Sequence, residues 1–304
     1  MNRLRELWKK ETGNALVFVS LALMALLAMT GLVIDGGMVY QTKSHLQKVA
    51  NAAALSGAQE LTNHQEKVEE VVYETLSKND QEAVLTNLEI TMEEKVAVDL
   101  EVPVSLAFSK LFGKDQILVK AHAAAELRTM GRAAGAAPLG IDKSIPLEYY
   151  KEYQLKVDQH DNDTGNFGIL ALGGTGADTY EYNLRHGYKN ELSVGDVLET
   201  QTGNIAGKTR TVVRERVNGC DENPRDVNVR ECSRVILIPI YEPIDYQGNQ
   251  LKQVRIVGFA YFYITDPMDE HDTSIRGMFI ERAGTGYEEP GALERGAFSI
   301  RLTE

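Results

Sequence analysis

The chain has 304 residues and a formal net charge of −12. Residues 1–14 carry four cationic and two anionic side chains, so residues 15–304 carry a net charge of −14. A chain this acidic lacks the basic patch that nucleic-acid binding requires, and we expect no nucleic-acid partner. The same charge disfavours docking of this region on anionic lipid headgroups. Residues 35–304 are numerous enough for one large domain or two ordinary ones.

Residues 15–34 form an apolar segment without charge or proline. As a helix this segment would span ~30 Å, the thickness of a bilayer's hydrocarbon core. A cleaved secretory signal would be shorter and would end in a small-x-small cleavage site. A core helix would show a polar face, which this segment lacks. We therefore predict a retained membrane anchor, which is marked by Ala15, Leu26, Ile34 and Asp35.

The charges on the two flanks of the anchor predict its orientation. Residues 1–14 contain Arg3, Arg5, Lys9 and Lys10, whereas the twenty residues after the anchor contain only Lys43 and Lys48 as strong cations. An excess of Lys and Arg stays on the cytoplasmic side. We therefore expect a single-pass protein of the cell membrane with a cytoplasmic N-terminus and an extracytoplasmic region of residues 35–304.

Two rows of residues recur at helical spacing after the anchor, in a stretch without proline. The first row is Leu46, Val49, Ala53, Gly57 and Leu61. The second row is Ala50, Ala54 and Ala58. Rows of small residues let another helix approach closely. Two interpretations stay open: this face packs on the protein's own domain, or it packs on a partner helix, which includes a homo-oligomer through the anchor helix.

The order of these features carries a family resemblance. Gly13-Asn14 precede the anchor, Ile34-Asp35-Gly36-Gly37 end it, Tyr40 follows, and residues 46–58 read LQKVANAAALSGA. Residues 13–61 resemble the N-terminal segment of TadE/TadG-like proteins of Flp (tight-adherence) pilus assembly, and residues 61–130 resemble their continuation more loosely. The resemblance implies a bitopic, pilin-like membrane protein that acts with other pilus-assembly proteins or pilins and has no chemistry of its own.

The chain also departs from related patterns. Type IV prepilins have a glutamate five residues after the cleavage-site glycine, whereas Phe18 stands five residues after Gly13. Larger TadG proteins carry a von Willebrand A domain with an Asp-x-Ser-x-Ser metal motif, which this sequence lacks. Residues 165–174 and 192–196 look like segments that follow the anchor in Gram-positive Tad-like proteins.

Residues 35–130 are predicted to form the long pilin-like helix and a small α+β module. Hydrophobic periodicity predicts a helix over residues 62–79 and a hairpin of residues 88–92 and 96–102. A short helix closed by Gly113 and a strand over residues 116–126 should follow. Residues 131–140 (GRAAGAAPLG) are rich in small residues, and we predict a linker and a domain boundary there.

Residues 141–304 are predicted to form a mostly β exported domain, because short apolar or alternating runs are separated by turn residues. The predicted strands are 167–172, 194–198, 209–213, 235–241, 254–264, 278–280 and 297–302. A helical turn is predicted over residues 181–188. The predicted fold class is therefore α+β, with a single N-terminal transmembrane helix extended into a pilin-like helix, a small α+β module and a mostly β C-terminal domain.

No catalytic constellation is evident in the sequence. The glycine-rich residues 173–176 are not followed by the lysine of a phosphate-binding loop, and nucleophile-elbow and zinc-helix motifs are absent. Asp158, Asp161 and Asp163 resemble part of a calcium loop, but the glycine is one residue early and the distal glutamate is missing. A solvated turn is the other interpretation, and the acidic residues 266–272 have the same two interpretations. We expect no enzyme activity and no cofactor.

Cys220 and Cys232 flank a hydrophilic segment. An exported domain lies where disulfides persist, and closing this loop would contribute about 3 kcal/mol in the chain-entropy model. We predict a disulfide, with free thiols as the alternative. The sequence thus predicts a membrane-anchored component of a Tad/Flp-type pilus or secretion assembly system that acts through protein–protein contacts. The alternative function is an anchored surface-binding or adhesive protein that uses its β-rich domain.

Overall fold

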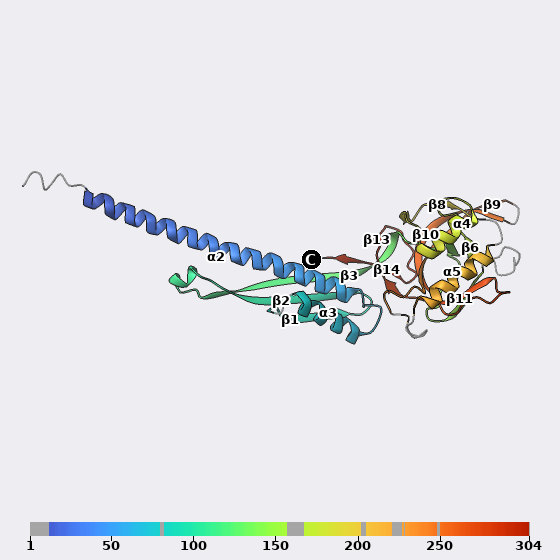
Figure 1. Ribbon diagram of the computed structural model, residues 1–304, viewed down its shortest axis with the longest axis horizontal. Helices are drawn as coiled ribbons and strands as arrows, with labels where there is room; N and C mark the ends of the chain where they lie inside the picture. Colours follow the sequence, from blue (N-terminus) through green and yellow to red (C-terminus); the bar gives the residue numbers. More distant parts are fainter. Residues whose placement is uncertain are drawn as a thin grey trace, which may run out of the picture.

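The computed structural model describes residues 12–79, 82–156, 167–201, 205–220, 227, 229–247 and 250–303. The molecule is elongated, with a long helix at one end, a helix-covered sheet in the middle and a larger β-rich unit at the other end (Figure 1). The fold is α+β, as predicted.

Helix α2 (Thr12–Ala58) is continuous through the apolar segment and the residues that follow it. No proline interrupts it, and alanine and leucine, which favour helix, are frequent along its length. Its first half extends beyond the rest of the protein, and its second half lies on the sheet (Figure 1). The predicted continuation of the apolar helix into a pilin-like helix is therefore confirmed.

Helix α3 (Gln65–Asn79) packs against the end of α2 through its buried stripe of Val68, Val72 and Leu76. The two helices approach closely at Gly57. A Cβ atom built at Gly57 would lie 2.7 Å from Cγ2 of Val72, a distance that real Cβ contacts essentially never show. The small side chain at position 57 is therefore what allows α3 to lie against α2.

The first sheet has the strand order β1-β2-β3-β14-β12, and β13 and β7 also pair with β3. Its strands are β1 (Val84–Thr91), β2 (Lys95–Ser105), β3 (Gln116–Ala133), β7 (Leu192–Ser193), β12 (Arg282–Ala283), β13 (Tyr287–Glu288) and β14 (Ala297–Leu302). The predicted hairpin is β1–β2, whose turn places Glu93 at a φ of 63°. Strands β2 and β3 form a longer hairpin, whose tip contains the short helix η1 (Ser109–Phe112) and Gly113 at a φ of 83°.

The predicted linker over residues 131–140 is not an exposed connector. Strand β3 continues to Ala133, and the next strand begins at Leu139. Ala133, Ala136, Ala137 and Leu139 are buried. Small residues occupy this stretch because strands and loops from both units pack closely around it. The C-terminal strand β14 also returns to pair with β3, so the chain passes between the two units more than once.

The second sheet has the strand order β5-β11-β10-β9-β4-β6, with β8 paired to β10. Its strands are β4 (Leu139–Asp142), β5 (Glu152–Lys156), β6 (Phe167–Ile169), β8 (Val197–Glu199), β9 (Val235–Gln247), β10 (Gln250–Ile264) and β11 (Ser274–Ile280). Strands β9 and β10 form its long central hairpin. Aliphatic and aromatic side chains from the sheet and the two helices beside it form a single buried core.

Helices α4 (Ala177–His186) and α5 (Ala206–Asn218) pack on this second sheet. The helical turn predicted near residue 181 is part of α4, but the strand predicted over residues 209–213 is wrong, because these residues lie in α5. Thr209, Val212, Val213 and Val217 are buried at helical spacing. The β-branched residues favour strand locally, and burial of one helix face overrides that preference.

We predict that the Gly57→Val substitution destabilises the protein by about 1–3 kcal/mol, because the added side chain must displace Val72 or the helix that carries it. Urea unfolding of the full-length protein in detergent, followed by circular dichroism, measures the change. Gly37→Ala is the control, because a Cβ atom at Gly37 would meet no atom within 4 Å. Equal midpoints for the Gly57→Val variant and the unsubstituted protein would contradict the close packing of α2 and α3.

Candidate functional site: the anchor helix and its contacts

The first half of α2 exposes apolar side chains on all sides. Leu16, Phe18 and Leu26 are 71%, 72% and 62% exposed, and most other large residues up to Ile34 are similarly exposed. The hydroxyls of Ser20 and Thr30 donate hydrogen bonds to the carbonyl oxygens of Leu16 and Leu26. In water such a surface costs about 25 cal/mol per Å² of apolar area. By its length and composition, helix α2 is able to cross a membrane.

Asp35, the first charged residue after the apolar segment, is buried against the tip of the β2–β3 hairpin. Its side chain accepts hydrogen bonds from the backbone N–H groups of Ala107, Phe108 and Ser109 at 2.6–3.3 Å. The hydroxyl of Ser109 donates a further hydrogen bond of 2.7 Å. One carboxylate therefore satisfies the N–H groups at the start of η1, and Asp35 thereby fixes the hairpin tip to α2.

Gly31 completes this contact one turn earlier on α2. A Cβ atom at Gly31 would lie 2.4 Å from the ring of Phe108, so only glycine lets the tip lie this close to the helix. The sequence identified Asp35 only as the end of the anchor. Its donors lie 72–74 residues further along the chain, and no local pattern links the two segments.

Near its start, strand β3 has a neighbouring strand on one side only. Side chains of α2 beyond Asp35 cover the open edge. Lys43 donates a hydrogen bond from Nζ to the carbonyl oxygen of Lys120 at 2.5 Å. Gln47 donates from Nε2 to the carbonyl oxygen of His122, also at 2.5 Å. Strand β14 pairs with β3 only from Ala125 onward, so α2 protects a stretch that would otherwise present unpaired carbonyl groups.

The two rows of small residues predicted as a helix-packing face are covered by the protein itself. Ala50, Ala53, Ala54 and Ala58 have no exposed surface, and they form one core with side chains of α3 and the first sheet. Of the two interpretations left open by the sequence, this geometry corresponds to packing on the protein's own domain. A partner helix, including that of a second copy, would have to use another face of α2.

The β-rich unit built on the second sheet is called the distal unit. An ion pair joins it to the turn that follows α2. Arg230 donates from Nε to Oε1 of Glu60 at 2.7 Å, and its guanidinium also contacts the side chain of Gln59. Arg282 donates hydrogen bonds to the carbonyl oxygens of Val229 and Arg230, and burial lowers the pKa of its guanidinium. Glu60 is largely buried, so this contact is shielded from solvent on one side.

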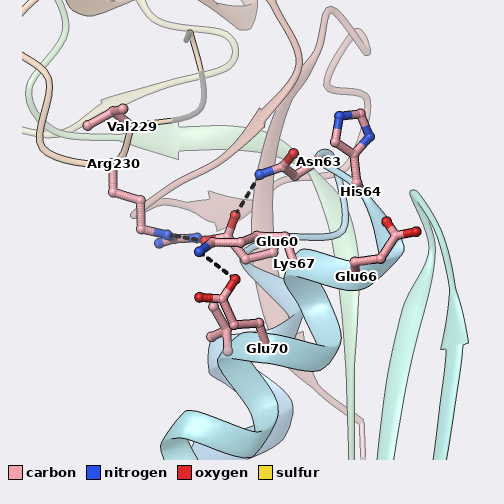
Figure 2. A pocket seen from close by; sticks show the side chains of 9 residues that line it. Glu60, Asn63, His64, Glu66, Lys67, Glu70, Val229 and Arg230 are labelled. Atoms are coloured by element: carbon pink, nitrogen blue, oxygen red, sulfur yellow. Dashed lines mark hydrogen bonds and ion pairs between the residues drawn. The ribbon is translucent and has the colours of Figure 1, made fainter. Parts of the chain in front are cut away.

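An open groove of about 720 Å³ lies beside this contact, between α3 and the segment of Val229 and Arg230. Figure 2 shows Glu60 paired with Asn63 and Arg230, and Lys67 paired with Glu70, whereas no interaction is drawn for His64 or Glu66. Asn63 donates to Oε2 of Glu60, and Lys67 forms an ion pair of 2.9 Å with Glu70, which raises the pKa of Lys67. The groove is therefore a junction between the two units, and the charges of Glu60, Lys67, Glu70 and Arg230 are paired within the protein.

The remaining predicted site residues belong to the C-terminal half of the sequence. Asp158, Asp161 and Asp163 lie outside the described residues, so the calcium interpretation stays a prediction. Within the described part of the chain, no group of three or more His, Cys, Asp or Glu side chains could hold a metal ion. The Sγ atoms of Cys220 and Cys232 are 2.01 Å apart and form a disulfide in the structure, packed with Tyr263 and Ile280.

Helix α2 thus has a protruding apolar half that continues into a half packed on the first sheet. Residues 13–60 match the family described as putative Flp pilus-assembly TadE/G-like. The resemblance seen in the sequence is thus confirmed for this segment, which supports a role associated with a Tad/Flp pilus. The match covers α2 and the turn after it but not the two sheets. No curated protein and no solved structure matches the chain.

We predict that Asp35→Ala releases the hairpin tip from α2. The substitution removes the acceptor of the Ala107, Phe108 and Ser109 N–H groups. The free energy of local opening should fall by about 2 kcal/mol, which corresponds to roughly 30-fold faster hydrogen exchange. Hydrogen–deuterium exchange of the peptide that covers the tip measures the effect.

Asp115→Ala is the matched control, because Asp115 lies on the same tip but its side chain is exposed and 4.0 Å from Lys110. This variant should exchange as the unsubstituted protein does. Unchanged exchange in the Asp35→Ala variant would show that the carboxylate does not hold the tip.

We predict that Glu60 and Arg230 are energetically coupled. A double-mutant cycle with Glu60→Gln and Arg230→Ala should give a coupling energy of about 1–2 kcal/mol, since one partner is largely buried. The exposed pair Glu74 and Lys78 of α3 is the control, and its coupling should be clearly smaller because solvent screens it. Urea unfolding of the four proteins of each cycle measures the free energies of unfolding from which the coupling energy is calculated. Equal coupling in both cycles would mean that the junction is no stronger than a surface ion pair.

Proposed function

We propose that this protein is a membrane-anchored component of a Tad/Flp-type pilus or secretion assembly system that acts through protein–protein contacts. The observation that carries the proposal is the division of α2 into two halves. The half up to Ile34 exposes apolar side chains on all sides, and the half from Leu46 onward is buried in the protein's own core. The first half then lies in the bilayer, and the second holds the sheets outside it.

The orientation in this proposal follows from the flanking charges. Four cationic side chains precede the apolar segment, and two follow it closely, which favours a cytoplasmic N-terminus. The region after Asp35 then lies outside the cytoplasm, where a Cys220–Cys232 disulfide would persist. The TadE/G-like match of residues 13–60 supports partners that are themselves pilus-assembly proteins or pilins.

The buried face of α2 leaves its exposed positions as the candidates for contact with a partner. Leu26 lies in the apolar half, and Tyr40 is 77% exposed just beyond it. The rows at Ala50, Ala54 and Ala58 are unsuitable for testing assembly, because changing them would disturb the core. The protein needs no chemistry of its own for this function, and its long rigid helix serves to position surfaces relative to the membrane.

Site-specific photo-crosslinking in native cells tests this function. A photoreactive amino acid at Leu26 or Tyr40 should give adducts that mass spectrometry identifies as pilus-assembly proteins or pilins. The control is the same variants without irradiation, which should give no such adduct. Adducts found only from the exposed Tyr182 of α4, and only with cell-envelope or matrix components, would favour the adhesive function instead.

Protease treatment of intact cells tests the orientation separately. Added protease should digest epitope-tagged protein from its C-terminal end and leave a membrane-protected fragment that contains the first residues. Full protection of the C-terminal tag in intact cells, with digestion after lysis, would place residues 35–304 in the cytoplasm and contradict the proposed orientation.

A further inference from the structure

We propose that the tip of the β2–β3 hairpin is a second membrane contact, in which Leu111 and Phe112 insert into the outer leaflet beside the anchor and Asp35 holds them at that depth. This inference rests on the proposed anchoring of α2 in a bilayer. The tip comprises residues 106–115 and is defined by η1 and Gly113. Its ligand is the lipid surface itself.

The position of the tip along α2 is the first argument. Figure 1 shows the β2–β3 hairpin running beside α2 toward the apolar half of the helix. Phe108 lies on Gly31, and the N–H groups around it bind Asp35. Gly31 precedes Ile34 by three residues, which is about 4.5 Å along a helix. If residues 15–34 span the hydrocarbon core, the tip lies at the boundary between acyl chains and headgroups.

The exposed side chains of the tip are the second argument. Leu111 and Phe112 are 82% and 69% exposed, and neither packs on the rest of the protein. Ile117 and Leu118, at the start of β3, are 41% and 50% exposed and extend the apolar surface on both faces of the hairpin end. Such a surface at the end of a hairpin is unfavourable in water, and a bilayer beside it removes that cost.

The backbone of the tip is suited to a low-dielectric environment. Beyond the three N–H groups held by Asp35, those of Leu106, Leu111, Gly113 and Lys114 donate to carbonyl oxygens of Asp115, Phe108, Lys110 and Ser109, respectively. Unsatisfied backbone groups are costly in lipid, so a loop can enter it only when such groups have partners. The Asp35 carboxylate accepts hydrogen bonds from the N–H groups of residues 107–109, which η1 itself cannot satisfy.

The charges of the tip fit the interfacial region. Lys110 and Lys114 are exposed on either side of the apolar pair. Lysine at this depth can extend its ammonium group to the headgroups while its methylene chain stays among apolar groups. The rest of residues 35–304 is acidic and is not attracted to anionic lipid. Insertion of Leu111 and Phe112 is therefore the main driving force, and the two lysines add to it locally.

Tryptophan quenching by brominated lipid tests this contact in the full-length protein. The sequence contains one tryptophan, Trp8, so all variants carry Trp8→Phe. Phe112→Trp reports on the tip, Phe18→Trp reports on the anchor, and Tyr246→Trp reports on an exposed position of β9 in the distal unit. Each variant is reconstituted into vesicles of phosphatidylcholine with a minority of phosphatidylglycerol, with bromine near the headgroup end of the acyl chains.

We expect the Phe112→Trp variant to lose most of its fluorescence to brominated lipid and to emit at shorter wavelength than the Tyr246→Trp variant, which should not be quenched. Quenching of the Phe18→Trp variant without quenching of the Phe112→Trp variant would overturn this inference and leave the proposed anchoring intact. The tip would then face water and be available to a protein partner. Absence of quenching in both variants would overturn the anchoring itself.

A second comparison tests the role of Asp35 as a positioning residue. Adding Asp35→Ala to the Phe112→Trp variant should markedly reduce quenching, whereas adding Asp115→Ala should leave it unchanged. Adding Asp35→Ala to the Phe18→Trp variant should leave the quenching of the anchor unchanged, which shows that the protein is still inserted. Equal quenching of the tip with and without the Asp35 carboxylate would overturn its assignment as the group that sets the depth.

Discussion

The packing of the second half of α2 on the first sheet is the interaction on which the rest of the structure depends. Ala50, Ala53, Ala54 and Ala58 bring the helix axis close to the sheet, and Gly57 brings α3 close to α2. Because these alanines have no exposed surface, sliding or rotation of the helix would uncover buried apolar area, so the helix is held in one register. The direction of the apolar half is therefore set by the half that packs on the sheet.

Polar contacts fix this helix at three levels along its length. Asp35 holds the hairpin tip, Lys43 and Gln47 cover carbonyl groups of β3, and Glu60 binds Arg230 of the distal unit. The contacts of Asp35 and Glu60 satisfy groups that would otherwise be costly to bury, and those of Lys43 and Gln47 satisfy carbonyl groups near the surface. Together they make one elongated body in which a displacement of the apolar half of α2 would be transmitted to the distal end.

The two sheets are more closely connected than the order of segments along the chain suggests. Strand β3 passes from the first sheet toward the distal unit, and β14 brings the C-terminus back beside it. A partner bound to the distal unit would therefore act on a structure that is continuous with the anchor helix. This continuity distinguishes the protein from one in which a binding domain is attached to its anchor by a flexible linker.

The sequence by itself determined the features that follow from local patterns. The uncharged segment up to Ile34 predicts the long apolar helix, and alternation and periodicity predict the β1–β2 hairpin, α3 and the short helix closed by Gly113. The TadE/G-like segment was also recognisable, because its features follow one another within residues 13–60. These signals are local, so they need no knowledge of what lies across the fold.

Only the tertiary structure decided which surfaces remain free. Asp35 finds its donors more than seventy residues away, and most of the small residues of 131–140 are buried. The β-branched residues after Thr209 form a helix because one face is covered. The alanine rows could equally have met a partner helix, and the position of the first sheet settled that they meet the protein itself. Burial depends on segments distant in sequence, which is why composition and spacing alone do not specify it.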